Sequence, residues 1–219
     1  MSPALFQLIV LAAIAIFLIL KLKSVLGTRD GYEDDPVQTE RPLARDITNF
    51  EVIEGGPDHD IIDHVTEGSD SAVALAQMKR LEPAFNVGAF LQGSKAAYEM
   101  ILMAFERGDL QPVRRFLAPD VLEAFDAAVA DRRQQGLSVE AEFLGLRELV
   151  LTEASFDARS REAEITVRFG SELISVARDA NGVVVEGDPK APRKQRDSWT
   201  FARVMGSADP NWQLVATGG

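Results

Sequence analysis

The chain contains no cysteine and only two histidines among its 219 residues. The absence of cysteine excludes disulfides, thiolate metal sites and cysteine nucleophiles. A metal site built on His59 and His64 would need further ligands in a rigid frame, whereas both lie in an acidic, turn-rich stretch. We therefore expect no metal and no cofactor, and we interpret both histidines as ordinary polar residues.

A stripe of basic residues is also missing. The net charge is −11, and it is spread unevenly: +2 over residues 1–28, −10 over residues 29–71 and −3 over residues 72–219. The last part mixes both signs, as soluble protein surfaces usually do. Without a basic face, nucleic acid is excluded as the primary ligand.

Charge and polarity are almost absent near the N-terminus. From Pro3 to Leu20 no residue is charged, and Gln7 is the only strongly polar side chain. As an α-helix this run would be about 27 Å long and apolar on all sides, which predicts a transmembrane anchor. A cleaved signal peptide would instead have basic residues before the run and a small-residue cleavage site after it. The anchor residues are Leu5, Phe6, Leu8, Ile9, Val10, Leu11, Ile14, Ile16, Phe17, Leu18, Ile19 and Leu20.

The orientation of this anchor depends on Lys21, Lys23 and Arg29, which all follow the apolar run. Basic residues stay on the cytoplasmic side, so the N-terminus is expected outside and the rest of the chain inside. Residues 29–71 are acidic and rich in turn formers, a composition that predicts a disordered linker. Short apolar patches at residues 47–53 and 61–65 are either incidental or docking sites.

Residues 72–219 change from helical to strand periodicity. Apolar residues at helical spacing predict helices over residues 72–81, with Asp70 as the cap, 86–107 and 119–135, and a helical turn over 112–117. Period-two alternation then predicts strands within residues 143–157, 162–179, 183–187, around 199–204 and at 212–217. Helices followed by a strand meander indicate an α+β domain, with the helices on one face of a curved antiparallel sheet in a cone.

Aromatic residues are spaced so that they could meet inside this cone. They either fill its core, which is the usual role, or line a ligand pocket. The aromatic residues concerned are Phe90, Tyr98, Phe105, Phe125, Phe169, Trp199 and Phe201.

Three stretches resemble the Tim44 family, the scaffold of the mitochondrial inner-membrane import motor, and its bacterial membrane-anchored relatives. They are KLKSVLGTRDGYE at Lys21–Glu33, then Phe90–Leu110 with FLAPDVLEAF at Phe116–Phe125, and DSWTFAR at Asp197–Arg203 with DPNWQL at Asp209–Leu214. The match covers the anchor and most of the C-terminal domain in order and spacing.

This resemblance implies a cone-shaped fold like that of nuclear transport factor two. It also implies a scaffold in protein translocation or membrane-protein biogenesis, which contacts membrane lipids and a translocase, chaperone or ribosome component. The expected location is the bacterial inner membrane with the domain in the cytoplasm. The alternative is the mitochondrial inner membrane with the domain on the matrix side.

Two other functions stay open at this point: a tethered lipid or small-molecule binding cone, and an enzyme of the same fold. The chain has no Walker loop, dinucleotide fingerprint or serine nucleophile elbow. The only candidate catalytic pair is Tyr98 with Asp197, so we expect no enzymatic activity. An apolar cavity would favour the binding cone, a buried polar cluster the enzyme, and a filled core with an exposed patch the scaffold.

One local basic cluster, formed by Arg193, Lys194 and Arg196, falls in a predicted surface turn. Such a turn is either simply solvated or a contact site for lipid headgroups or an acidic partner. These three residues are the candidate lipid or partner contacts.

Overall fold

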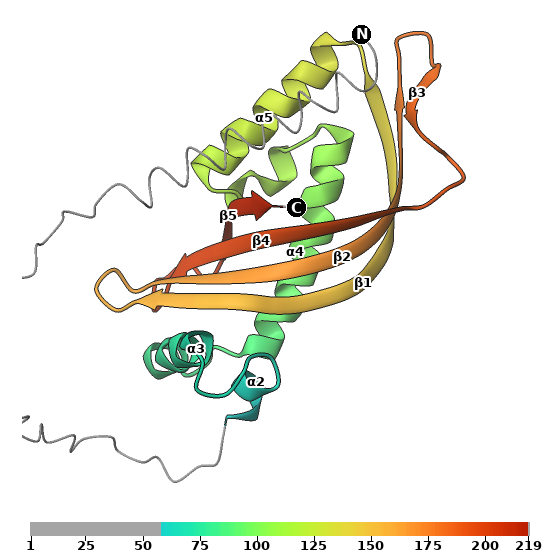
Figure 1. The fold of residues 1–219 in the computed structure, drawn as a ribbon. Helices are drawn as coiled ribbons and strands as arrows, with labels where there is room; N and C mark the ends of the chain where they lie inside the picture. The colour runs from blue at the N-terminus through green and yellow to red at the C-terminus, as the bar shows by residue number, and fades with distance from the viewer. Residues whose placement is uncertain (1–57, 219) are drawn as a thin grey trace, which may run out of the picture. The chain divides into compact units, whose positions relative to one another are not determined.

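A computed structural model describes residues 58–218 (Figure 1). The predicted anchor residues, together with Lys21, Lys23 and Arg29, lie outside the described residues, as does the predicted linker up to residue 57. Within residues 58–218, no helix combines the length and the apolar composition needed to cross a bilayer.

The helices come first in the chain, as the periodicity predicts. They are α2 (His59–Ile62), α3 (Asp70–Leu81), α4 (Val87–Arg107), the 3₁₀ helix η1 (Gln111–Phe116) and α5 (Pro119–Gln134).

Helix α3 starts earlier than predicted, and its cap is a different residue. Ser69, not Asp70, is the N-cap, and its hydroxyl accepts a hydrogen bond of 3.2 Å from the amide of Ala72. Asn86 caps α4 in the same way through the amide of Ala89, at 2.7 Å.

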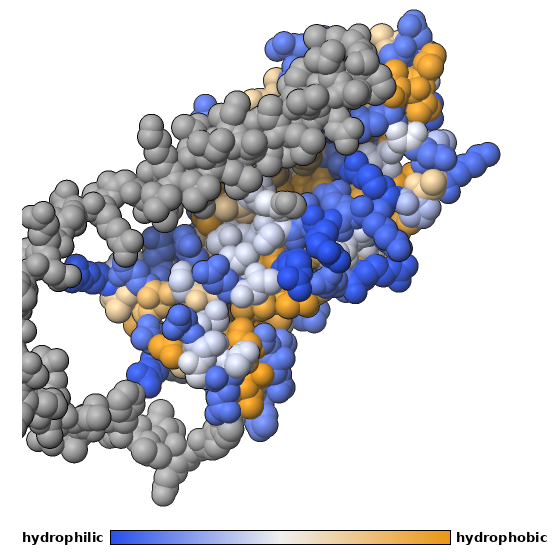
Figure 2. Space-filling model, viewed as in Figure 1, coloured by the Kyte–Doolittle hydropathy of each residue, from blue (hydrophilic) through white to orange (hydrophobic). Residues whose placement is uncertain are grey.

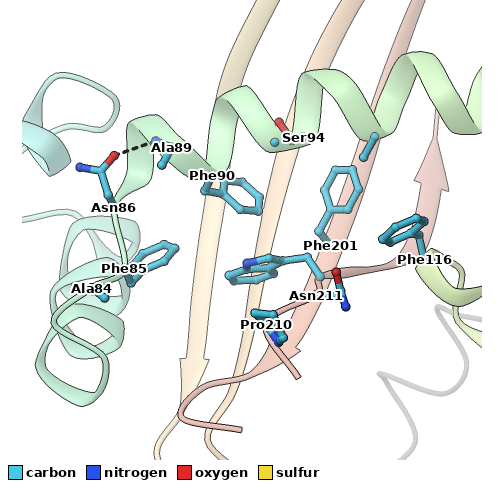
Figure 3. A pocket seen from close by; sticks show the side chains of 13 residues that line it. Ala84, Phe85, Asn86, Ala89, Phe90, Ser94, Phe116, Phe201, Pro210 and Asn211 are labelled. Carbon is cyan, nitrogen blue, oxygen red and sulfur yellow. Dashed lines mark hydrogen bonds between the residues drawn. The ribbon is translucent and has the colours of Figure 1, made fainter. Parts of the chain in front are cut away.

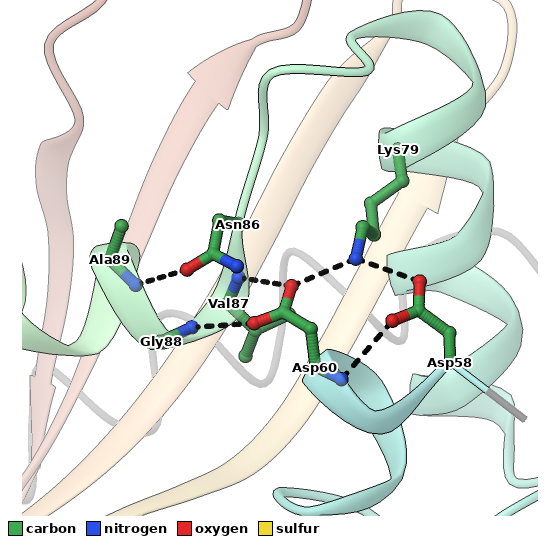
Figure 4. A network of polar contacts seen from close by, with 7 residues as sticks. All are labelled: Asp58, Asp60, Lys79, Asn86, Val87, Gly88 and Ala89. Carbon is green, nitrogen blue, oxygen red and sulfur yellow. Dashed lines mark hydrogen bonds and ion pairs between the residues drawn. The ribbon is translucent and has the colours of Figure 1, made fainter.

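Residues 58–71 belong to the fold, so the prediction that the linker extends to residue 71 is wrong for this part. The carboxylate of Asp60 accepts hydrogen bonds from the amides of Val87 and Gly88, at 2.9 and 3.1 Å, and from Lys79 at 2.9 Å (Figure 4). Ile61 is buried in the core. An acidic composition predicts a disordered linker, so it did not reveal this packing. In the fold, one of these acids, Asp60, accepts hydrogen bonds from the free amides at the start of α4.

The electrostatics of Asp60 fit this role. Burial alone would raise the pKa of Asp60, but the hydrogen bonds from Lys79, Val87 and Gly88 outweigh burial and leave the pKa below its usual value. The two predicted linker histidines stand in or next to α2, where His59 is exposed and His64 is half-buried. Among residues 58–218, no group of three or more His, Asp or Glu side chains is placed to hold a metal ion.

The strands form one antiparallel sheet in the order β1-β2-β4-β5, and β3 pairs with the far end of β2. They are β1 (Ser138–Asp157), β2 (Glu162–Arg178), β3 (Val184–Gly187), β4 (Arg193–Val204) and β5 (Gln213–Gly218). The pairing of β1 with β2 shifts register at Phe143/Gly145, Leu146/Glu148 and Leu151/Glu153. Such bulges bend a strand pair, and Figure 1 shows the bent sheet.

Side chains alternate along β2 as predicted. Ile165, Val167 and Phe169 are buried, whereas the intervening Thr166 and Arg168 are on the opposite face. Helices α3 and α4 both contact β1 and, with the buried side chains of β2 and β4, enclose the core. Residues 58–218 therefore form an α+β domain with helices packed on an antiparallel sheet.

Strand β4 begins at Arg193, which corrects the prediction that Arg193, Lys194 and Arg196 lie in a turn. Lys194 pairs with Glu172 of β2 and Arg196 pairs with Gly170. The polar sequence of this stretch lacks the apolar alternation that predicts a strand. The strand forms because β2 pairs with it over its whole length.

Candidate functional site

The aromatic residues of the predicted cone mostly fill the core. Tyr98 and Phe169 are fully buried, and their rings stack with centroids 4.3 Å apart. The ring centroids of Trp199 and Tyr98 are 4.7 Å apart, and Phe201 is also buried. The half-buried Phe105 of α4 packs against Phe125 of α5, with ring centroids 4.8 Å apart. Core packing is therefore the role of these rings, and Phe90 and Phe201 additionally reach a groove described below.

Tyr98 and Asp197, the candidate catalytic pair, do come together. The hydroxyl of Tyr98 donates to Oδ2 of Asp197 at 2.5 Å and lies 2.9 Å from Oγ of Ser171. Gln195 donates to the same carboxylate oxygen at 2.8 Å. These contacts join α4 to strands β2 and β4.

The titration behaviour of this pair suits a structural contact. Burial, strengthened by the hydrogen bond to Asp197, raises the pKa of the Tyr98 phenol far above its usual value. Burial also raises the pKa of Asp197, although hydrogen bonds from Tyr98 and Gln195 act against it. Neither side chain lines the groove described next, so the pair has no visible access to a substrate there.

An open apolar groove of about 350 Å³ lies between α4, η1 and the loop that precedes β5 (Figure 3). Its walls are aromatic and contain Phe85, Phe90, Phe116, Phe201 and Trp212. Phe90 and Trp212 meet edge to face at 4.8 Å, which gives the groove a packed floor.

Small side chains on α4 keep this groove open. Ala89, Gly93 and Ala97 follow one another at a spacing of four residues and therefore lie on one helix face. A Cβ atom placed on Gly93 would meet no atom within 4 Å other than those of its chain neighbours and its own helix backbone. The groove is thus real space beside the helix.

The loop that forms the far wall is held by Arg203. Its guanidinium lies over the ring of Trp212, 5.4 Å from the centroid, and donates to the carbonyl of Pro210 at 3.1 Å. It also pairs with Glu82 at the end of α3, and this hydrogen bond lowers the pKa of Glu82. The Arg203 side chain is only 9% exposed, so the ion pair is largely shielded from water.

Arg115 is the cation at the rim of the groove. Its guanidinium lies 4.5 Å above the ring of Phe116, and within residues 58–218 it has no carboxylate within 4 Å. The neighbouring Arg114 pairs with Asp126 at 3.5 Å. Asp209, in the opposite loop, accepts two hydrogen bonds from Asn211 through one oxygen.

The predicted basic cluster does not form a single patch. Asp197 points inward to Tyr98, so Arg193 shares its strand face, and Lys194 and Arg196 are on the other face. Arg196 lies 3.6 Å from the carboxylate of Glu148 on β1. The cluster is exposed but divided between the two faces of the sheet.

A second exposed apolar surface lies at the β3 hairpin, which Figure 2 shows as an orange patch. Val183 and Val185 are 58% and 50% exposed. Strand β3 pairs only with β2 among the described strands, so its other edge is open. Such an edge can accept a further strand.

Sequence reasoning missed the groove. The sequence features that belong to the groove are the small residues Ala89, Gly93 and Ala97 and the segment Pro210–Trp212. These features lie far apart in the chain. Only the fold brings them to one place.

A protein family, a plant protein and a solved chloroplast structure are similar to this chain. Residues 71–219 match the family described as "Tim44-like domain". The chain is 19% identical over 178 residues to mitochondrial import inner membrane translocase subunit TIM44-1 of Arabidopsis thaliana, covering 80% of this chain and 37% of that relative. The crystal structure of the intermembrane space region of chloroplast protein ARC6 aligns with 58% of this chain and 94% of its own, at 15% identity and a TM-score of 0.38, too low to indicate a common fold.

Proposed function

Because this chain belongs to the Tim44-like domain family, we propose that it is a membrane-anchored scaffold and that it has no enzymatic activity. Its apolar segment at residues 3–20 would anchor it, with the domain on the cytoplasmic side of a bacterial inner membrane. The matrix side of the mitochondrial inner membrane is the alternative. In this proposal the domain is a cone like nuclear transport factor two.

The observation that carries the scaffold proposal is the open aromatic groove outside a filled core. An exposed apolar surface of this kind is typical of protein contact sites. We propose that the groove holds an apolar segment of a protein partner, such as a translocase, chaperone or ribosome component. The buried Tyr98–Asp197 contact supports a non-catalytic role because it already satisfies both groups.

Filling the groove should abolish partner capture. Gly93→Leu places a side chain in open space on α4 and also removes a helix glycine, so the variant should fold. We expect in-cell crosslinking and mass spectrometry of the full-length protein to recover a partner that Gly93→Leu loses at least tenfold. Gln92→Leu is the matched control, because Gln92 is exposed on α4 outside the groove.

The same experiment separates the scaffold from a tethered binding cone. A groove of about 350 Å³ is near the lower limit for small-molecule pockets, so a lipid or small molecule is the second candidate ligand. If only lipid or a small molecule co-purifies, and Gly93→Leu removes it, the binding cone replaces the scaffold. If Gly93→Leu and Gln92→Leu recover the same partners, the groove is not the binding site.

We also propose that Arg193, Lys194 and Arg196 contact anionic headgroups or an acidic partner. Exposed cations near a membrane each add about 1 kcal/mol of attraction to an anionic surface. Changing all three residues to glutamine should therefore lower sedimentation of the protein with anionic vesicles, and added salt should lower it further. Unchanged vesicle binding would rule out this contact.

A further inference from the structure

The charged side chains around the groove bear on which apolar partner it would bind, a question that rests on the proposed function. No charged side chain of α4 lines the groove, since that helix contributes Ala89, Phe90, Gly93, Ser94 and Ala97 there, and its N-cap Asn86 is uncharged. The rim charges come from η1 and from the loop before β5.

Two of the arginines near the groove are already paired with carboxylates. Arg203 is paired with Glu82, and Arg114 is paired with Asp126. Asp209 stays ionised, because the hydrogen bonds from Asn211 lower its pKa, with Arg203 and Arg115 contributing more weakly. Arg115 is therefore the one exposed guanidinium beside the groove that has no carboxylate within 4 Å among the described residues.

Arg115 is also held in place. Its guanidinium stacks over Phe116, which itself lines the groove, and its backbone carbonyl accepts a hydrogen bond from Gln213 at 3.3 Å. A planar guanidinium held over an aromatic ring still offers its edge to a carboxylate, in a bidentate geometry that a lysine would not provide.

We infer that the groove binds an apolar segment of another protein that carries an acidic residue next to its apolar side chains, and that Arg115 pairs with this acid. The aromatic walls accept the apolar anchors, while the carboxylate fixes their register at the Phe116 end. An uncharged or basic segment with the same apolar residues would leave Arg115 unpaired or repel it.

Three synthetic peptides test this selection against the full-length protein in nanodiscs. Each carries the same phenylalanine and leucine anchors, flanked by glutamate, glutamine or lysine. We expect the glutamate peptide to bind about tenfold more tightly than the glutamine peptide, because one charge-assisted hydrogen bond is gained. Arg115→Glu should reverse the order and favour the lysine peptide, whereas Arg159→Glu, an exposed change in the β1–β2 turn, should leave it unchanged.

The outcomes distinguish this inference from the function on which it rests. If Gly93→Leu abolishes binding of all three peptides but Arg115→Glu changes no preference, the groove is a docking site and the acidic selection is wrong. If Gly93→Leu leaves peptide binding unchanged, both ideas fail. If none of the peptides binds, while anionic phospholipid vesicles bind the wild type and Gly93→Leu abolishes that binding, the occupant of the groove is lipid and the inference is overturned.

Discussion

Replacing Tyr98 with alanine should lower the free energy of unfolding by about 3–5 kcal/mol. The side chain is fully buried between Phe169 and Trp199, so its removal leaves a cavity in the middle of the core. It also leaves the half-buried carboxylate of Asp197 without its shortest hydrogen bond. Urea denaturation of residues 58–219 followed by tryptophan fluorescence would measure this loss.

Tyr98→Phe separates packing from hydrogen bonding at this position. The ring and its stacking remain, so we expect a smaller loss of about 1–3 kcal/mol, which comes from the unsatisfied Asp197 and Ser171. If Tyr98→Phe costs as much as Tyr98→Ala, the hydroxyl contacts rather than ring packing stabilise the junction of α4 with the sheet. A loss below 1 kcal/mol for Tyr98→Ala would contradict the central position of this residue in the core.

Replacing Glu82 with alanine should cost about 1–3 kcal/mol, because it leaves the largely shielded guanidinium of Arg203 without its carboxylate. The amide of Gly206 would also lose its acceptor. Since Arg203 holds Pro210 and lies over Trp212, the same change should loosen the far wall of the groove. Glu123→Ala is the control, because Glu123 is exposed on α5, and surface changes of this kind usually stay within about 0.5 kcal/mol.

The contribution of Glu82 should depend on pH in one direction. The hydrogen bond from Arg203 lowers the pKa of Glu82 in the folded protein below the 4.5 expected for an unfolded chain. Its stabilisation is therefore fully present above about pH 4.5 and is lost as the pH falls through the lower folded pKa. Stability of the wild type should fall more steeply than that of Glu82→Ala in this acid range. Parallel curves would contradict the ion pair.

Local signals predicted most of the secondary structure. The helical periodicity of α4 and the period of two in β2 act within a few residues, so the sequence reveals them directly. The start of β4 at Arg193 and the docking of Asp60 were missed because they depend on partners in β2 and α4. Tertiary contacts outweighed composition in both places.

The candidate site was less predictable than the fold. Tyr98 and Asp197 were paired correctly because both fall on inward positions of regular elements. The groove was not foreseen, since its walls join α4, η1 and an irregular loop whose path the sequence pattern does not specify. The ion pair of Arg203 with Glu82, which positions that loop, likewise joins the end of α3 to β4.

The most direct test of the scaffold proposal places a photo-crosslinking amino acid at Ala97, inside the groove, in the full-length protein in living cells. The same amino acid at Ala130, exposed on α5, is the control. We predict discrete protein adducts from Ala97 that are absent from Ala130 and that Gly93→Leu suppresses. Adducts of equal pattern at both positions, or only lipid adducts at Ala97, would contradict a groove that holds a protein partner.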